Sequence, residues 1–234
     1  MTDSFVDPFD NFTVIVFPRL NKLDSTKLSI ASIHTFLQQL LAALAKLHEF
    51  RIAHLDVTPS NIMCQSDGQI TLIDFGLARS TKCGSHPACR GTQGFVAPEL
   101  YSGMSHDTKP DIYSLGIVFG IWLQPFVQEC GLELLGSKLV RGKVTSEIQR
   151  HLQERVLERF MEPEIPDVLY EAMDLLSKMI ESDPCERISA EEASQHKFFC
   201  ADSISLENIQ PCACNLQKKA RARRDADVEI IRYR

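Results

Sequence analysis

The eight residues HLDVTPSN, at positions 54–61, place a carboxylate and a carboxamide in one short loop. Asn61 follows Asp56 by five residues, which is close enough for both side chains to act at one site. Side-chain oxygens of these types bind Mg²⁺, and a carboxylate can also accept a proton. Asp and Asn are also common as capping residues of loops. Taken singly, the two residues therefore leave a chemical role and a structural role open.

The elements on either side of this loop are predicted by residue spacing and turn signals. Before it, apolar residues recur at helical spacing over 32–50 and predict a long amphipathic helix. After it, a short strand near 62–64, an Asp-Gly turn at 67–68 and the strand QITLID at 69–74 predict a small hairpin. Near the N-terminus, the β-branched and aromatic string NFTVIVF at 11–17 predicts a strand.

The remainder of the chain is predicted to be mostly helical. The string DIYSLGIVFGIWL at 111–123 begins with an N-capping Asp and is apolar on all sides, which is typical of a helix in the centre of a domain. Further helices are predicted at 145–161, 168–181 and 190–196. Residues 80–96 are rich in Gly, Ser, Thr, Cys and Pro and predict a long irregular segment, which in a compact domain is usually functional or disordered.

Composition and charge exclude several classes of protein. Hydrophobic residues make up 44% of the 234 residues and charged residues 24%, as is usual for a folded soluble protein. The net charge of −6 argues against general nucleic-acid binding, which needs a basic surface. No signal peptide is recognisable, and the most apolar stretch, SLGIVFGIWL, is about half as long as the ~20 residues that span a bilayer. We therefore expect an intracellular protein, of the nucleus or the cytoplasm, with neither a membrane anchor nor a direct nucleic-acid partner.

Four of the eight cysteines form two loose pairs, Cys83 with Cys89 and Cys212 with Cys214. A zinc site needs four ligands and usually contains tightly spaced Cys pairs. Here the pairs are ill-spaced and far apart in the sequence, so free thiols are favoured over a metal site.

Three short strings follow one another along the chain: HLDVTPSN, then DFG at 74–76 and APE at 97–99. With the downstream string DIYSLG and Arg187 in CERISAEEASQHKFF, they make the sequence from about Asn11 to Phe199 resemble the C-terminal lobe of a eukaryotic protein kinase of the serine/threonine type. The resemblance implies an α+β, protein-kinase-like fold, mainly the helical large lobe with a small catalytic-loop hairpin. The sequence also resembles the cell-division-cycle-seven type of replication-origin kinase, through DVTPSN, GTQGFVAPE and the cysteines just before GTQGFVAPE. That type has a long, interrupted activation segment, whereas the segment in this sequence is short.

The resemblance implies a role in chemistry or substrate binding for five residues. Asp56 would orient the substrate hydroxyl and accept its proton, while Asp74 and Asn61 would hold the Mg²⁺ that accompanies ATP. Thr92 would place a hydroxyl near the catalytic Asp, which favours Ser or Thr over Tyr as acceptor. Gly94 lies in the same substrate-binding loop.

The same resemblance implies structural roles for four residues. Glu99 and Arg187 should form a buried ion pair, Asp111 should brace the backbone of the catalytic loop, and His54 begins that loop. Such roles would persist in a relative without activity.

Two positions in the loop depart from the family pattern. Leu55 replaces the Arg that pairs with a phosphorylated activation loop in most members, which suggests that phosphorylation does not order that loop through this contact. Thr58 replaces the Lys that reaches the γ-phosphate in serine/threonine kinases, and the loss of that cation removes transition-state stabilisation typically worth a few kcal/mol.

The family elements that precede the catalytic loop are not found in this sequence. The first glycine is Gly68, so no glycine-rich phosphate-binding loop precedes Asp56, and none of the three lysines before the loop lies in a β-branched strand. We therefore expect a small lobe that is largely missing, with its last strand at 1–17, a large lobe at 18–200, and a charged, flexible tail at 201–234.

Three interpretations of the function follow. The leading hypothesis is a serine/threonine protein kinase with ATP and Mg²⁺ as cofactors, which acts on Ser or Thr of protein substrates and has a regulatory or complementing protein subunit. The alternative is a pseudokinase that binds partners through the helical lobe. A truncated gene model of an ordinary kinase would also explain the missing lobe. Intact Asp56, Asn61 and Asp74 favour the enzyme, whereas Thr58 and the missing lobe favour the binding module.

Overall fold

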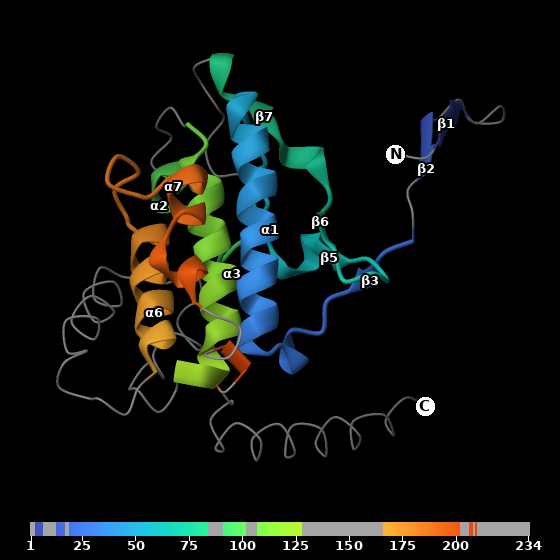
Figure 1. Cartoon of the computed structure of the whole chain (residues 1–234). Coiled ribbons are helices and arrows are strands. Elements are labelled where there is room, and N and C mark those ends of the chain that lie inside the picture. The colour runs from blue at the N-terminus through green and yellow to red at the C-terminus, as the bar shows by residue number, and fades with distance from the viewer. Residues whose placement is uncertain are drawn as a thin grey trace, which may run out of the picture.

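A computed structural model describes residues 3–6, 13–16, 19–83, 91–101, 107–127, 166–201, 206–207 and 209. Three long helices lie side by side, with α3 between the other two (Figure 1). They are α1 (Ile30–Glu49), α3 (Lys109–Val127) and α6 (Asp167–Met179). The short helix α7 (Ala190–Ser194) packs on α1.

The other described elements are short. The strands are β1 (Asp3–Val6), β2 (Thr13–Val16), β3 (Asn21–Lys22), β4 (Ile52–Ala53), β5 (Ile62–Cys64), β6 (Ile70–Leu72) and β7 (Arg79–Ser80). The short helices are α2 (Pro98–Tyr101), η1 (Ser25–Lys27), η2 (Pro59–Asn61), η3 (Phe75–Leu77), η4 (Thr81–Cys83) and η7 (Lys197–Cys200).

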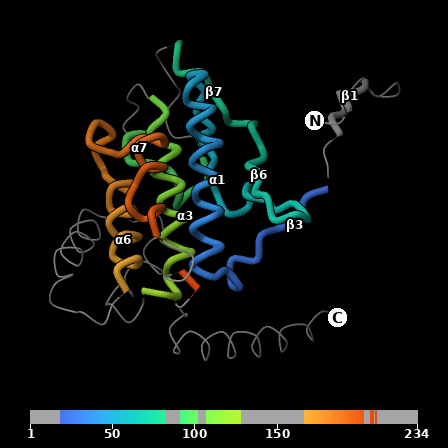
Figure 2. Tube along the Cα trace, viewed as in Figure 1, coloured from blue at the N-terminus to red at the C-terminus, as the bar shows by residue number. Residues whose placement is uncertain are grey.

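The strands pair into three small antiparallel sheets: β1 with β2, β4 with β7, and β3–β5–β6. In the β5–β6 hairpin, Ile62 pairs with Leu72 and Cys64 with Ile70, so the hairpin closes at the predicted Asp-Gly turn. The sheet is attached to α1, because the side chain of Gln39 accepts the N–H of Ile70 at 2.8 Å. Figure 2 shows the chain passing from α1 through the loop at 54–61 into this hairpin.

Helix α1 forms where a Ser cap precedes an apolar stripe. The Ser29 hydroxyl accepts the N–H of Ser32 at 3.1 Å and so satisfies one of the free donors of the first turn. One face is buried, through Ile30, Ile33, Leu37, Leu40, Leu41 and Leu44. The helix predicted at 32–50 is therefore found, and it begins two residues earlier and ends one residue earlier.

Among the described residues, α1 is also the one helix that is long and apolar enough to cross a membrane, with a mean hydropathy of 1.2 over its best window. The core helix of a globular domain meets the same criterion. Because the apolar stripe of α1 is buried against the rest of the fold, the criterion is weak support for a membrane span here.

Helix α3 is buried on nearly every side, as its all-round apolar sequence predicts. It extends the prediction of 111–123 by two residues at the start and four at the end. Gly116 lets it approach the end of α6 closely, because a Cβ there would lie 2.8 Å from Ile180 Cγ2 and 3.0 Å from Met179 Cβ. A larger residue at 116 would push the two elements apart.

Other predictions hold in part. The helices predicted at 168–181 and 190–196 are found as α6 and α7, the second ending two residues early. The helix predicted at 145–161 and nearly all of the tail at 201–234 lie outside the described residues, as do the side chains of all four cysteines of the two loose pairs. The strand predicted at 11–17 is found as β2, and it pairs with a second strand, β1, that was not predicted. The segment DSFV is too short and too mixed to show a period, so β1 was missed.

Candidate active site

The loop at 54–61 leaves β4 and enters β5, and its backbone is held by Asp111 at the start of α3. One carboxylate oxygen of Asp111 accepts the N–H of Leu55 and the other accepts the N–H of His54, both at 2.8 Å. His48, in the last turn of α1, places Nε2 2.9 Å from the second oxygen. Asp111 is fully buried, so these three contacts offset the cost of removing its carboxylate from water.

This bracing sets the backbone of Leu55 in a conformation that non-glycine residues seldom adopt. Its φ is +64°, in the left-handed region, which costs roughly 1–2 kcal/mol for a residue with a Cβ. The side chain points into the core and is only 5% exposed. Leu55 therefore fills space in the core, where an Arg of the family pattern would carry a cation.

Asp56 connects two separate parts of the chain. The side-chain amide of Asn61 donates to Oδ2 of Asp56 at 2.8 Å and to its backbone carbonyl at 2.9 Å. On the other side, Oδ1 accepts the N–H of Thr92 at 3.0 Å and the Thr92 hydroxyl at 2.7 Å. The carboxylate is thus fixed from both sides by uncharged donors.

His54 joins the loop to the strand that precedes Asp74. Its Nδ1 accepts the N–H of Asp56 at 3.3 Å, and its Nε2 lies 3.1 Å from the carbonyl of Ile73. Since Nδ1 is an acceptor, the ring proton is on Nε2 and is donated to Ile73. The imidazole is fully buried and lies edge-on to the ring of Phe75, 4.8 Å away.

Asp74 itself lies at the exposed surface of this region. Its φ of +63° and ψ of +78° turn the chain sharply, and its Oδ1 accepts the N–H of Gly76 at 3.1 Å. Asn61 is 8% exposed, and no described residue donates a hydrogen bond to its side-chain oxygen. A carboxylate and an amide oxygen are the hard ligands that Mg²⁺ prefers, so the residues present fit this ion.

Thr58, at the position of the family Lys, is 1% exposed, and its hydroxyl lies 2.8 Å from that of Ser60.

The segment after 91 passes close to the same loop. Gly91 has φ +122°, and a Cβ there would lie 2.8 Å from the carbonyl oxygen of Leu55. Gly94 is buried with φ +97°, and the Ser114 hydroxyl of α3 donates to the next carbonyl, that of Phe95, at 2.7 Å.

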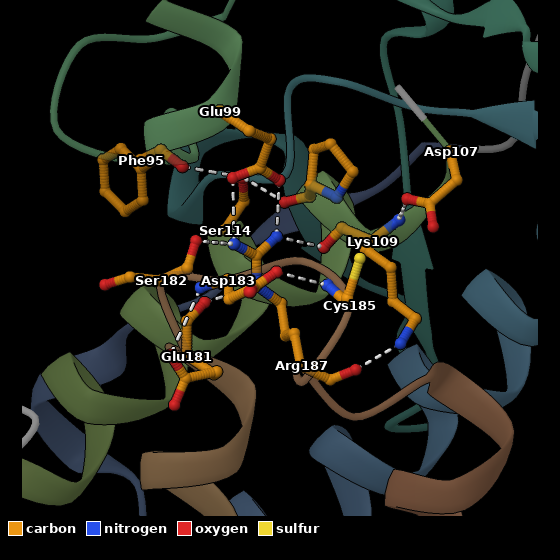
Figure 3. A network of polar contacts seen from close by, with 11 residues as sticks. Phe95, Glu99, Asp107, Lys109, Ser114, Glu181, Ser182, Asp183, Cys185 and Arg187 are labelled. Carbon is orange, nitrogen blue, oxygen red and sulfur yellow. Dashed lines mark hydrogen bonds and ion pairs between the residues drawn. The ribbon is translucent and has the colours of Figure 1, made fainter. Parts of the chain in front are cut away.

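Glu99 and Arg187 lie together, near Phe95 of this segment (Figure 3). The guanidinium donates to the two carboxylate oxygens of Glu99 at 2.6 and 2.9 Å, and the side chains are 4% and 0% exposed. Arg187 also donates to the carbonyls of Glu181 and Lys109, at 2.7 and 3.0 Å. The ring of Tyr113 lies 5.0 Å from the guanidinium carbon, and burial raises the pKa of Tyr113 to about 12.

Comparison with known proteins decides the family. Residues 12–199 match the protein kinase domain. The chain belongs to the protein kinase family. The prediction of a eukaryotic protein kinase is therefore confirmed, whereas the likeness to the cell-division-cycle-seven type and the missing small lobe stay predictions.

Named relatives of this kinase chain are serine/threonine and mitogen-activated kinases. Serine/threonine-protein kinase PLK4 of Drosophila willistoni is 30% identical over 211 residues, which cover 86% of this chain and 24% of the relative. Serine/threonine-protein kinase ULK3 of Xenopus laevis is 32% identical over 81% of this chain and 37% of the relative. Mitogen-activated protein kinase HOG1 of Wallemia muriae is 30% identical over 85% of this chain and 78% of the relative. The chain thus matches about a quarter of the length of the PLK4 relative.

Two residues of the site were not anticipated from the sequence. His48 continues the buried face of α1, four residues after Leu44. A polar residue on an apolar stripe was the sequence signal that could have pointed to its role. Gly91 was given no role from the sequence, whereas in the structure a Cβ at this position would lie 2.8 Å from the carbonyl oxygen of Leu55. Its role depends on a contact between distant segments, which residue spacing does not show.

Proposed function

We propose that this chain is the catalytic lobe of a serine/threonine protein kinase that transfers the γ-phosphoryl group of Mg·ATP to Ser or Thr side chains of proteins. The observation that carries the proposal is the double attachment of Asp56, to Asn61 on one side and Thr92 on the other. No described Lys, Arg or His forms an ion pair with Asp56. A general base must be held in one direction towards the proton that it accepts, and these donors hold the carboxylate of Asp56 in that way.

In this reaction the oxygen of the substrate hydroxyl forms a bond to the γ-phosphorus and the bond from that phosphorus to the ADP oxygen breaks. The hydroxyl proton passes to Asp56, which orients the nucleophile. Asp74 and Asn61 would hold Mg²⁺, which supplies positive charge at the phosphates. Thr92 keeps Asp56 facing the segment over which a protein substrate would lie.

The remaining parts of a kinase site would come from a small lobe, present in a complementing subunit or encoded together with this chain. The sequence has no glycine before Gly68 with which to cover the phosphates. The ring of Phe75 is 49% exposed although it contacts the buried His54, and it offers an apolar surface on which such a lobe could pack.

A pseudokinase is the second candidate, and Thr58 favours it. The residue is buried and bonded to Ser60, so no cation is available from this position for the developing charge. This interpretation keeps the fold and the partner-binding surface and predicts little or no turnover.

Transfer of ³³P from ATP to a mixed Ser, Thr and Tyr peptide pool distinguishes the two candidates. The enzyme is a fusion of the full chain to the small lobe of a relative, and its matched controls are Asp56→Asn and Asp74→Asn. We expect labelling of Ser and Thr by the fusion and none above background by either variant. Thr58→Lys should raise turnover only modestly, because the new side chain must first leave a buried position. A folded fusion that labels nothing, or an Asp56→Asn variant that labels equally well, would favour the pseudokinase.

A further inference from the structure

One end of the fold carries cations from separate segments of the chain. Strand β4 follows α1 and packs on it, and β7 pairs with β4, so these elements lie side by side (Figure 1). The stretches 46–53 and 79–83 together contain one carboxylate, that of Glu49, and four cations. The cations are Lys46 of α1, Arg51 of the turn into β4, Arg79 of β7 and Lys82 of η4. This end is therefore positive, in a chain whose net charge is −6.

The backbone brings Arg51 to the start of η4. The φ of Arg51 is +59°, which turns the chain sharply after α1, and its N–H donates to the carbonyl of His48 at 2.9 Å. The carbonyl of Arg51 accepts the N–H of Thr81 at 2.8 Å and so continues the β4–β7 pairing by one residue. Lys82 follows Thr81 directly. Two exposed cations from distant parts of the sequence thus lie next to one interstrand hydrogen bond.

Three of the four cations have no counterion among the described residues. Lys46 is paired, because its ammonium lies 2.8 Å from a carboxylate oxygen of Glu49. No described carboxylate forms an ion pair with Arg51, Arg79 or Lys82, and the guanidinium of Arg79 donates to the carbonyl of the preceding residue at 2.6 Å. The negative end of the α1 dipole accounts for cations near the last turn of that helix. It does not account for Arg79 and Lys82, which come from other elements.

An exposed aromatic ring lies in the same turn. Phe50 comes directly before Arg51 and, at 59%, is the most exposed large apolar side chain that the structure describes. The ammonium of Lys46 lies 5.1 Å from the centre of its ring, within the range of a cation–π contact. A ligand that contacts both the ring and the unpaired cations would carry negative charge next to an apolar side chain.

We propose that Phe50, Arg51 and Lys82 form a docking patch for a partner protein that carries a phosphorylated Ser or Thr beside an apolar residue. Charge complementarity favours this ligand. A phosphorylated side chain carries a charge of about −1.5 to −2 and three acceptor oxygens, so it can accept hydrogen bonds from several cations at once. A single carboxylate carries less charge and would leave more of the cations unpaired. The docking patch does not depend on the proposed catalytic function.

Fluorescence anisotropy with the full chain, in the absence of ATP, tests this proposal. The probe is a fluorescein-labelled peptide pool with a central phosphoserine and randomised neighbours, and the same pool with unmodified serine is its control. We expect the phosphorylated pool to bind at least about tenfold more tightly, as one hydrogen bond to a charged group would give. Added salt should reduce this preference, because the cations are exposed. Sequencing of the retained peptides should show apolar residues enriched beside phosphoserine.

Two pairs of substitutions, each of which removes two exposed cations, serve as matched variants. Arg51→Asn with Lys82→Gln removes them from the docking patch, and Asn tolerates the positive φ at position 51. Lys22→Gln with Lys197→Gln removes them elsewhere. We expect the first pair to abolish the preference for phosphoserine and the second to preserve it. Phe50→Ser should keep the preference but abolish the enrichment of apolar neighbours.

Several outcomes would contradict the docking patch. If the chain with both Arg51→Asn and Lys82→Gln does not fold, Lys82→Gln alone should still weaken binding of the phosphorylated pool. Equal binding of the two pools, or equal losses in the two pairs of variants, would overturn the proposal. Tighter binding of duplex DNA or of phosphatidylserine vesicles than of the phosphorylated pool would also overturn it, because the cations would then serve a different class of ligand.

Discussion

Glu99 and Asp56 are carboxylates of the same lobe, but their surroundings differ in charge. Glu99 receives two hydrogen bonds from the guanidinium of Arg187, and both side chains are sealed from solvent. Asp56 receives its hydrogen bonds from an amide, a hydroxyl and a backbone N–H, and it remains partly exposed. The first arrangement neutralises a buried charge and so stabilises the fold. The second fixes the direction of a carboxylate with uncharged donors alone.

Glu99→Ala should have the largest effect on stability. It leaves the buried guanidinium of Arg187 without its counterion, which costs roughly 3–5 kcal/mol in comparable pairs. Arg187→Ala should cost a similar amount, because it leaves the Glu99 carboxylate unpaired. Urea unfolding of the full chain at neutral pH measures both.

Asp56→Ala is the matched control for these variants. A partly exposed side chain bonded to neutral donors should contribute only about 1 kcal/mol to the free energy of unfolding. A loss as large as that of Glu99→Ala would remove the distinction between a structural and a catalytic carboxylate in this protein.

Alkaline pH should weaken the Glu99 region selectively. Burial raises the pKa of Tyr113, beside Arg187, from 10.0 to about 12. A folded-state pKa above the unfolded one contributes stability that is complete below about pH 10 and is lost as the pH rises towards about 12. The shift corresponds to at most about 2.7 kcal/mol. Tyr113→Phe should remove this part of the alkaline loss, and equal pH curves for the two proteins would show that the phenol does not contribute.

The same contrast explains how much of the molecule could be predicted from its sequence. Helices α1 and α3 were predicted because their apolar residues follow a helical period that burial requires. Asp56, Asn61 and Asp74 were proposed as site residues from short strings within one stretch of chain. These features are local, so residue spacing and motif order are sufficient to find them.

The contacts that make these residues into a site are not local. Thr92 reaches Asp56 across 36 residues and His48 reaches Asp111 across 63, and residue spacing does not encode either distance. The inward direction of Leu55 depends on its left-handed backbone, and its N–H donates a hydrogen bond to Asp111 that holds this backbone in place. Family resemblance could suggest which residues meet, but not that the replaced Leu55 and Thr58 would both be buried.

Gly91 offers a test of the contact between the two segments that hold Asp56. Gly91→Ala places a Cβ 2.8 Å from the Leu55 carbonyl and also strains a φ of +122°, so we expect a loss of about 2 kcal/mol. Gly68→Ala is the matched control, because its φ is also positive, at +86°, but nothing lies within 4 Å of the new Cβ. It should cost about 1 kcal/mol. Equal losses for the two variants in thermal unfolding would mean that the close approach to Leu55 contributes nothing.

Thr92→Val should have a small effect on stability and tests directly whether the hydroxyl orients Asp56. Valine removes the hydroxyl that lies 2.7 Å from Asp56 but keeps the shape of the side chain and the N–H at 3.0 Å. The free energy of unfolding should fall by only about 0.5–1.5 kcal/mol, since one partly exposed hydrogen bond is lost. In the fusion with a small lobe, kcat should fall while KM for ATP stays the same, because the change affects the carboxylate proposed to accept the proton and leaves the proposed Mg²⁺ ligands in place. Thr92→Ser keeps the hydroxyl and should restore kcat. If Thr92→Val lowers stability as much as Glu99→Ala, or if Thr92→Ser fails to restore kcat, the hydroxyl does not act by orienting Asp56.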